Sequence, residues 1–286
     1  MTDIEIELLP ALPALGPLFA KTLVPRLHRG PAHVPSRTVL VRGVTQDVAR
    51  LAGYDRVCGF ALRDRVPPTW LHVLAFPLHV HLLSDPGSTI GLAGAVHVSN
   101  RMRLHRPVAV GESLDLSVRI DNLRPHRRGA LLDLVAAVRV ADEVVWDGVS
   151  TYLAQGASVP GAPVAIAGEE FPARPPIATW RLPADLGREY RRVSGDPNPI
   201  HTSRVAARAF GFARPIIHGM WTHARLLAAV EPRLAQAYAV EVRFTRPIPL
   251  PATVGAWWQQ DEPASWRAAV TTRDGTRPHL LAQITP

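Results

Sequence analysis

The sequence predicts an α+β protein made of two similar units, each with one apolar helix backed by a curved antiparallel sheet. Three observations lead to this expectation. Segments of the two halves echo one another at a nearly constant spacing, each half contains an apolar helical run, and alternating apolar and polar residues follow each run. A chain of 286 residues is long enough for two units, each with its own core.

The internal echoes set the expected boundaries of the units. The run before Gly195-Asp196 resembles the run before Gly53-Tyr54, 142 positions earlier (195 minus 53), and this spacing carries Gly219 onto Pro77. A third echo relates residues 103–112 to residues 243–252 at a spacing of 140 (246 minus 106). The expected divisions are an N-terminal extension over residues 1–35, an N-terminal unit over 36–155, a linker rich in Gly, Ala and Pro over 156–176, and a C-terminal unit over 177–286.

Residue periodicity places the helices and strands. A helix is expected from Gly219 to about Val230, because apolar residues recur there at helical spacing and Pro232 follows. In the first half, an apolar helix is expected within Leu74–Leu83. Strands are expected where apolar and polar residues alternate, at residues 113–120, 131–140, 240–244, 253–259, 266–271 and 280–284.

Composition excludes several functional classes. The formal charge of +8 comes mostly from arginine, since Lys21 is the only lysine, and it would favour a phosphate-bearing ligand or an acidic carrier protein. The basic run at residues 124–128 is too short and too poor in aromatics to indicate nucleic-acid binding. Cys58, the only cysteine, excludes an internal disulfide and a cysteine-based metal site. No membrane span or signal peptide is indicated, so a cytoplasmic location is expected.

The most informative stretch is Tyr190-Arg-Arg-Val-Ser-Gly-Asp-Pro-Asn-Pro-Ile-His201, followed by Arg214-Pro-Ile-Ile-His-Gly-Met220. Asp196 and His201 are separated by an asparagine and two prolines that stiffen the loop, so they can hold one water between a carboxylate and an imidazole. The second block places a free Gly219 N–H at the start of an apolar helix, where it can point at an oxygen that acquires negative charge. The alternatives without a catalytic role are an ordinary turn for the first block and an ordinary helix start for the second.

These two blocks resemble the MaoC-like dehydratases, also called R-specific enoyl-CoA hydratases or hydratase 2. The resemblance implies a hot-dog fold, in which an antiparallel sheet wraps a central helix, and the chain length resembles the double-hot-dog branch. It implies that Asp196 and His201 form the catalytic pair and that the Gly219 N–H binds the thioester carbonyl oxygen. Asn198 is the supporting polar group of the loop, and Ser194 and His218 are further candidates for contact with substrate.

The implied reaction is the reversible hydration of trans-2-enoyl thioesters to (R)-3-hydroxyacyl thioesters, carried on coenzyme A or acyl carrier protein. It uses neither a metal nor a redox cofactor. The resemblance also admits a homodimer of double hot-dogs. A hot-dog thioesterase would need a carboxylate on the central helix, and residues 219–230 contain no acid. The alternative from another class is a non-catalytic subunit that binds acyl thioesters or assembles with a catalytic partner.

The first half lacks the corresponding residues. At the spacing of 142, the active-site positions fall on Tyr54, Arg56, Gly59 and Pro77. Because tyrosine and glycine cannot replace a carboxylate and an imidazole, and proline has no N–H, we expect the first half to be catalytically inactive. Its expected roles are to complete the sheet and to shape an acyl pocket. Three histidines of this half, His72, His79 and His81, are not accompanied by acidic or cysteine ligands, so a metal site is not expected there.

Overall fold

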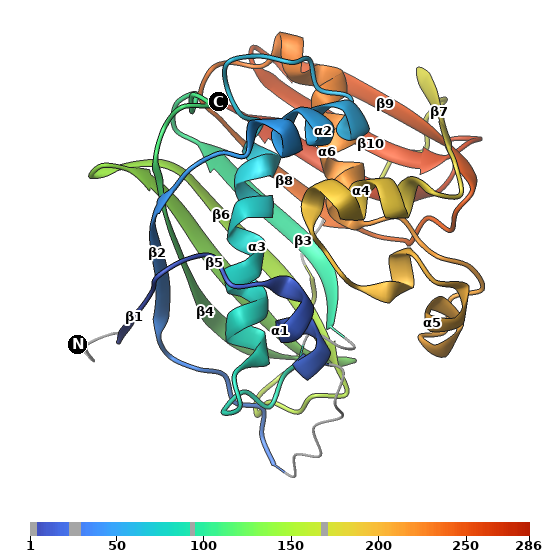
Figure 1. Cartoon of the computed structure of the whole chain (residues 1–286). Coiled ribbons are helices and arrows are strands. Elements are labelled where there is room, and N and C mark those ends of the chain that lie inside the picture. Colours follow the sequence, from blue (N-terminus) through green and yellow to red (C-terminus); the bar gives the residue numbers. More distant parts are fainter. Residues whose placement is uncertain (1–4, 23–29, 92–94, 167–170) are drawn as a thin grey trace. The chain divides into compact units, whose positions relative to one another are not determined.

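The computed structural model describes residues 5–22, 30–91, 95–166 and 171–286 (Figure 1). The chain forms two compact units that interleave along the sequence. The described residues of the first unit fall within Met1–Gln46, Leu71–Met102 and Val108–Ala167, and those of the second within Asp47–Trp70, Arg103–Pro107 and Gly168–Pro286. Residues 47–70, which precede the central helix of the first half in sequence, therefore cluster with the C-terminal half.

The first unit contains a sheet with the strand order β1-β2-β4-β5-β6-β3. Its strands are β1 (Ile6–Leu9), β2 (Thr38–Val44), β3 (Ala95–Leu104), β4 (Leu114–His126), β5 (Gly129–Val140) and β6 (Glu143–Gln155). β2, β4, β5 and β6 pair antiparallel in that order, whereas β1 pairs parallel with β2. Along β4, buried residues alternate with half-buried ones from Leu114 to Ile120, as expected of a strand with one face on a core.

Two helices accompany this sheet, α1 (Leu15–Thr22) and α3 (Pro68–Ser84). Most side chains of α3 are buried on all sides of the helix, including Leu71, Leu78, Leu82 and Leu83, which identifies it as a core helix. The expected helix at Leu74–Leu83 is confirmed, and it begins six residues earlier than predicted. The described helices are all too short or too polar to cross a membrane.

The second unit contains the antiparallel strand order β8-β11-β10-β9-β7. Its strands are β7 (Ala178–Leu182), β8 (Tyr238–Phe244), β9 (Ala252–Glu262), β10 (Ser265–Thr272) and β11 (Pro278–Thr285). Its helices are α2 (Val48–Cys58), α4 (Leu186–Ser194), α5 (Arg204–Ala209) and α6 (Gly219–Val230), with the 3-10 turns η1 (Pro199–His201) and η2 (Glu231–Arg233). The six expected strands of the two units are confirmed, with ends that differ by a few residues.

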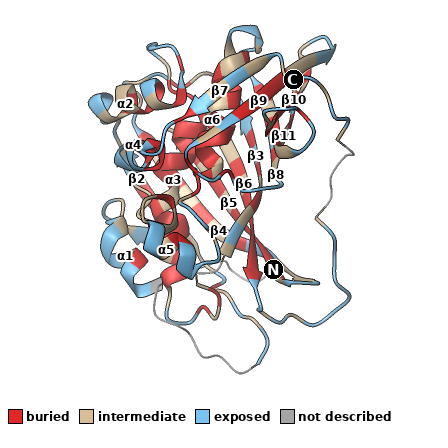
Figure 2. Cartoon of the chain, turned by 90° about the vertical axis from the view of Figure 1, so that its right-hand side faces the viewer, coloured by how far each residue is buried: buried red, intermediate tan, exposed pale blue. Residues whose placement is uncertain are grey.

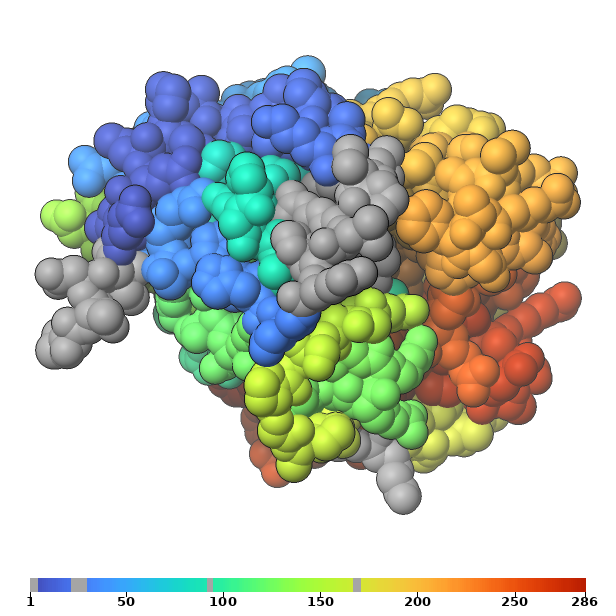
Figure 3. Space-filling view, turned by 90° about the horizontal axis from the view of Figure 1, so that it is seen from below, coloured from blue at the N-terminus to red at the C-terminus, as the bar shows by residue number. Residues whose placement is uncertain are grey.

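Helix α6 has the predicted bounds, Gly219–Val230, and is largely buried (Figure 2). It ends where the Pro232-containing turn η2 begins, because proline cannot continue the hydrogen-bonding pattern of the helix. Helix α5, in contrast, lies on the surface of the second unit, and its residues belong to the gold region of Figure 3. Its Val205 side chain is 81% exposed.

The structure corrects the sequence alignment of the two halves. Gly195 adopts a left-handed conformation (φ 78°) at the end of α4, and the residue with this role in the first half is Gly59 (φ 84°) at the end of α2. Tyr54 instead lies inside α2 and Pro77 inside α3, so neither occupies the position that the spacing of 142 assigned to it. The feature that the two halves share is a helix that ends at a glycine with positive φ, which glycine adopts without steric cost.

Candidate active site

The candidate active site begins at the glycine that ends α4. After Gly195 the chain leaves the helix, and the side chain of Asp196 is held by its own loop. The backbone N–H of Asn198 donates to Asp196 Oδ1 at 2.9 Å, and the Asp196 N–H donates to Ser194 Oγ at 3.3 Å. The sequence Asp-Pro-Asn-Pro favours this turn, because Asp and Asn accept hydrogen bonds from the backbone two residues on and proline fixes φ. Asp196 thus has a fixed orientation with its second oxygen, Oδ2, left for other partners.

The next turn places the imidazole of His201. Asn198 starts η1, and its Oδ1 accepts a hydrogen bond from the Ile200 N–H at 3.3 Å. His201 Nδ1 lies 2.8 Å from the backbone oxygen of Ile216. A carbonyl oxygen can only accept, so Nδ1 carries the hydrogen and Nε2 carries the lone pair when the ring is neutral. His201 is therefore set up to accept a proton at Nε2.

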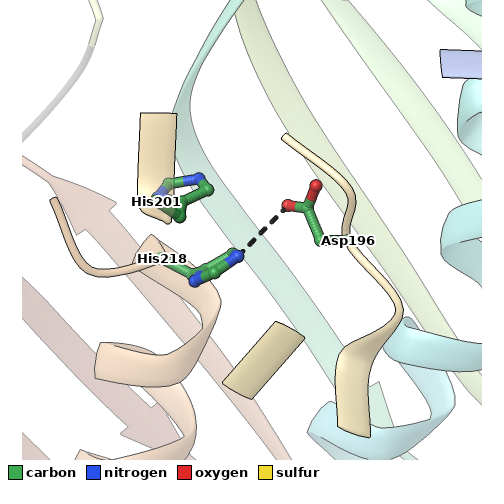
Figure 4. Close-up of side chains that lie close together, drawn as sticks. All are labelled: Asp196, His201 and His218. Carbon is green, nitrogen blue, oxygen red and sulfur yellow. Dashed lines mark ion pairs between the residues drawn. The ribbon is translucent and has the colours of Figure 1, made fainter. Parts of the chain in front are cut away.

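His218 completes a cluster of three side chains (Figure 4). Its ring stacks on that of His201 with centroids 3.6 Å apart and an interplanar angle of 25°. His218 Nε2 lies 3.8 Å from Asp196 Oδ2, and one side-chain oxygen or nitrogen from each of Asp196, His201 and His218 lies within 4.8 Å of the other two. The 3.8 Å separation is longer than a hydrogen bond, so the two side chains are neighbours that do not bond directly to each other.

Burial sets the protonation tendencies of the cluster. It raises the pKa of Asp196, although the His201 charge and the Asn198 N–H oppose this rise. Burial lowers the pKa of His201, against the opposite pull of Asp196. Burial also lowers the pKa of His218 well below its usual value, and the charges of His201 and Arg191 lower it further. The pKa values of Asp196 and His201 therefore move toward each other, which suits a pair that passes a proton back and forth.

Gly219 is the first residue of α6, and His218 is the residue before the helix. The Gly219 N–H has no carbonyl partner within the helix and makes no hydrogen bond to any other residue in the described part of the chain. A side chain at this position would press on Phe244, since an added Cβ would come within 3.0 Å of its ring. Glycine thus allows the start of α6 to pack closely on β8, and the N–H remains available to a ligand oxygen.

The cluster offers the ligand atoms that a metal ion such as Zn²⁺ uses, but its geometry does not fit one. The two imidazoles stack face to face, so the planes that contain their lone pairs are 25° from parallel and their ring centroids are 3.6 Å apart. A zinc ion binds in the plane of each imidazole at about 2.1 Å, and it cannot lie in both planes here without breaking the stack. We therefore interpret the cluster as a proton-transfer site, and the absence of a metal stays a prediction.

The structure brings three of the six candidate residues, Asp196, His201 and His218, into one cluster. The side chains of Ser194 and Asn198 accept hydrogen bonds from the loop backbone, and their contact with substrate stays a prediction. The stacking of His218 on His201 was not predicted, and neither was the position of Tyr190, whose ring lies 4.8 Å from that of His218. Tyr190 opens the motif in the sequence, but nothing in one sequence indicates what it packs against.

Comparison with known proteins identifies both halves. Residues 164–277 match the family model of the MaoC-like domain, and residues 44–149 match that of a FAS1-like dehydratase domain region. A curated relative, 3-hydroxyacyl-thioester dehydratase X of Mycobacterium tuberculosis, is 37% identical over 266 residues, which cover 93% of each chain. These matches span both units of the chain.

Solved structures give the same result for the fold. The crystal structure of HtdX of Mycobacterium tuberculosis has 36% sequence identity and a TM-score of 0.77, and the match covers 87% of this chain and 99% of that chain. Another protein of Mycobacterium tuberculosis, described as a double hot-dog fold, has a TM-score of 0.52 at 17% identity, over 90% of this chain and 96% of that chain. The second likeness bears on the fold alone, and together they confirm the expected double-hot-dog class.

Proposed function

Because the chain belongs to the MaoC-like dehydratase family, we propose that it reversibly hydrates trans-2-enoyl thioesters to (R)-3-hydroxyacyl thioesters. The observation that carries this proposal is the arrangement of Asp196 and His201 within 4.8 Å of each other, on a segment that is hydrogen-bonded to the residues just before the free Gly219 N–H. The family name of the relatives points to the same reaction class. Hydration leaves the overall oxidation level of substrate plus water unchanged, so no redox cofactor is required.

The proposed reaction gives each of these groups a role. A water between Asp196 Oδ2 and His201 Nε2 attacks C3 of the enoyl thioester, and the pair takes up one proton of that water. The electrons of the double bond move toward the thioester carbonyl, whose oxygen gains negative charge opposite the Gly219 N–H. The pair then delivers the proton to C2. Oxygen and both hydrogens of the water are now in the product, and the pair is back in its starting protonation state.

The helix start contributes to the charge that develops. The N–H groups of the first turn of α6 point away from the helix along its axis and carry partial positive charge, which favours an anion at that end. Burial around the cluster strengthens this interaction because a low-dielectric surrounding screens charge less than water does. We treat Asp196 and His201 as one coupled acid/base unit, since each changes the pKa of the other.

The thioester carrier in this proposal is coenzyme A or acyl carrier protein, and the activity is placed in the cytoplasm. A homodimer remains part of the prediction, to be checked by light scattering coupled to size-exclusion chromatography. A thioesterase is disfavoured because α6 carries no carboxylate that could activate a hydrolytic water.

The proposal is tested with purified protein and trans-2-enoyl thioesters of four to sixteen carbons, on both carriers. We expect loss of the enoyl-thioester absorbance, formation of the (R)-3-hydroxyacyl product on chiral chromatography, and no release of free thiol. Asp196→Asn should lose this activity while it keeps the wild-type circular dichroism spectrum. Free thiol as the main product would instead indicate a thioesterase. Binding without turnover on every chain length and carrier would indicate a non-catalytic subunit.

A further inference from the structure

Arg50, a residue of the first half of the chain, holds the end of the helix from which the proposed catalytic loop emerges. It lies in the first turn of α2, and its guanidinium donates two hydrogen bonds to successive carbonyls at the C-terminus of α4. Arg50 Nε donates to the Val193 oxygen at 2.7 Å, and an Nη donates to the Ser194 oxygen at 3.0 Å. These contacts all lie within the second compact unit.

The place of these two carbonyls matters because the catalytic loop begins right after them. Ser194 is the last residue of α4, Gly195 turns the chain, and Asp196 follows. The last carbonyls of a helix have no partner inside the helix and carry partial negative charge, so a cation that binds two of them fixes the final turn. The planar guanidinium does this with two parallel donors, which an ammonium group cannot reproduce.

The guanidinium itself is held from the other side. Its carbon lies 5.1 Å from the centre of the Trp70 ring, a cation–π distance. Close packing of the two helices supports the same contact, because Gly53 of α2 leaves room for Val193, whose methyl carbon would lie 3.1 Å from an added Cβ. Two hydrogen bonds, an aromatic face and tight helix packing therefore hold the Arg50 guanidinium against the end of α4.

We propose that Arg50 is a positioning residue for Asp196, acting through the C-terminal turn of α4. This inference rests on the proposed function, in which Asp196 is half of the acid/base pair. Helix α2 is the counterpart of α4 in the internal repeat, so the first half of the chain would supply the support for the catalytic loop of the second half. Helix α2 also contacts α6, the helix that begins at Gly219, because Trp221 Nε1 of α6 donates to the Val57 oxygen of α2 at 2.9 Å.

The test compares Arg50→Met and Arg50→Lys with Arg56→Met, a control that removes an exposed arginine from the same helix. Methionine keeps much of the side-chain volume and loses both donors, whereas lysine keeps the charge and one donor direction. We expect kcat to fall roughly 10- to 100-fold in Arg50→Met, since a displacement of about 1 Å of a catalytic group has effects of this size. Arg50→Lys should recover part of the loss, KM should change little, and Arg56→Met should match wild type.

The pH profile separates positioning from simple stabilisation. Burial raises the pKa of Asp196 in the intact loop. When the loop loosens and water enters, this pKa should fall toward its ordinary value, so the limb of the kcat/KM profile that Asp196 controls should move to lower pH. A residue that only stabilises the fold would lower the melting temperature and leave both the profile and the turnover per folded molecule unchanged.

A readout independent of activity completes the test. The Asn198 N–H donates to Asp196 Oδ1, and its hydrogen exchange reports whether the loop is closed. We expect faster exchange at Asn198 in Arg50→Met than in Arg56→Met, at a temperature where both are folded. The inference is overturned if Arg50→Met has the same exchange rate at Asn198 and the same kcat as Arg56→Met. If Arg50→Met does not fold, the same two measurements are made on Arg50→Lys. If wild type fails to hydrate enoyl thioesters, the proposed function fails, whereas the exchange result still decides the role of Arg50.

Discussion

Replacing Gly219 by proline removes one N–H from the candidate site, and proline fits the backbone at this position. Proline is tolerated as the first residue of a helix, where the N–H has no partner inside the helix. The residue before a proline must be extended, and His218 already is, with φ −61° and ψ 135°. Gly219→Pro should therefore fold, and what it loses is the hydrogen bond to the thioester oxygen.

The expected magnitude follows from the role of this donor. Loss of one donor from an oxyanion site costs roughly 10² to 10³ in kcat, or about 3–4 kcal/mol of transition-state stabilisation. The proline also introduces a Cβ that would lie 3.0 Å from the Phe244 ring, and this contact has its own cost. Gly219→Ala is the matched control, because it adds the same Cβ and keeps the N–H.

The assay is steady-state hydration of a short enoyl thioester by both variants, with melting temperatures measured alongside. We expect Gly219→Ala to lose activity modestly and Gly219→Pro to lose at least 10²-fold more than Gly219→Ala. If the two variants fold and have the same kcat, the Gly219 N–H is not the oxyanion donor. The two variants should bind a substrate analogue without the thioester carbonyl with equal affinity, because this analogue has no oxygen for the N–H at position 219.

Three further predictions concern packing, charge and stoichiometry. A Cβ at Gly187 of α4 would collide with the backbone oxygen of His201, so Gly187→Ala should lower kcat by up to about 10²-fold. The control is Gly16→Ala, whose added Cβ meets nothing within 4 Å, and equal activity of the two variants would contradict the packing argument. Burial, with a smaller effect from Glu231, raises the pKa of Asp55 from 3.8 to about 6. The folded state therefore favours the protonated carboxyl, and the stability that this gives is fully present below pH 4 and is lost as the pH rises through 6. Asp55→Asn should therefore raise the free energy of unfolding at pH 7 by at most ~3 kcal/mol and have little effect at pH 3.5, and a gain independent of pH in urea titrations would refute this. Titration with a tight, unreactive acyl thioester should saturate at one molecule per chain. In the first half, Phe60 follows the helix-ending glycine where the second half has Asp196, and Pro68, which has no N–H, begins the central helix where the second half has Gly219. Saturation at two per chain would show a second site.

The sequence predicted the parts of the site that depend on neighbouring residues. Asp196 and His201 are five positions apart in a loop stiffened by two prolines, so their proximity follows from local geometry. Helix α6 was placed correctly because its apolar spacing and the following proline are strong local signals. The stack of His218 on His201 was not predictable in this way. It depends on the chain returning beside the loop, where the Ile216 N–H donates to the Ile200 oxygen at 3.2 Å.

The alignment of the halves failed for a related reason. Similar residues around Gly53 and Gly195 suggested a spacing of 142 between the halves. The property that the halves share is instead the left-handed conformation of Gly59 and Gly195. Conformation at a glycine is decided by where the helix ends, and residue identity alone does not reveal it. The expectation of an inactive first half therefore rests on different residues, and it stays a prediction. The role proposed for Arg50 could not be predicted from the sequence either, since it requires knowledge that Arg50 of α2 contacts the end of α4.

The most direct test of the account is a double-mutant comparison of the catalytic pair. Asp196→Asn, His201→Ala and the double variant should each fold, and each single change should lower kcat by roughly 10² to 10⁴. If the two residues act as one unit on one water, the double variant should be little worse than either single variant. Turnover near the wild-type value in either single variant, or losses that multiply in the double variant, would contradict the proposal that Asp196 and His201 form one acid/base unit.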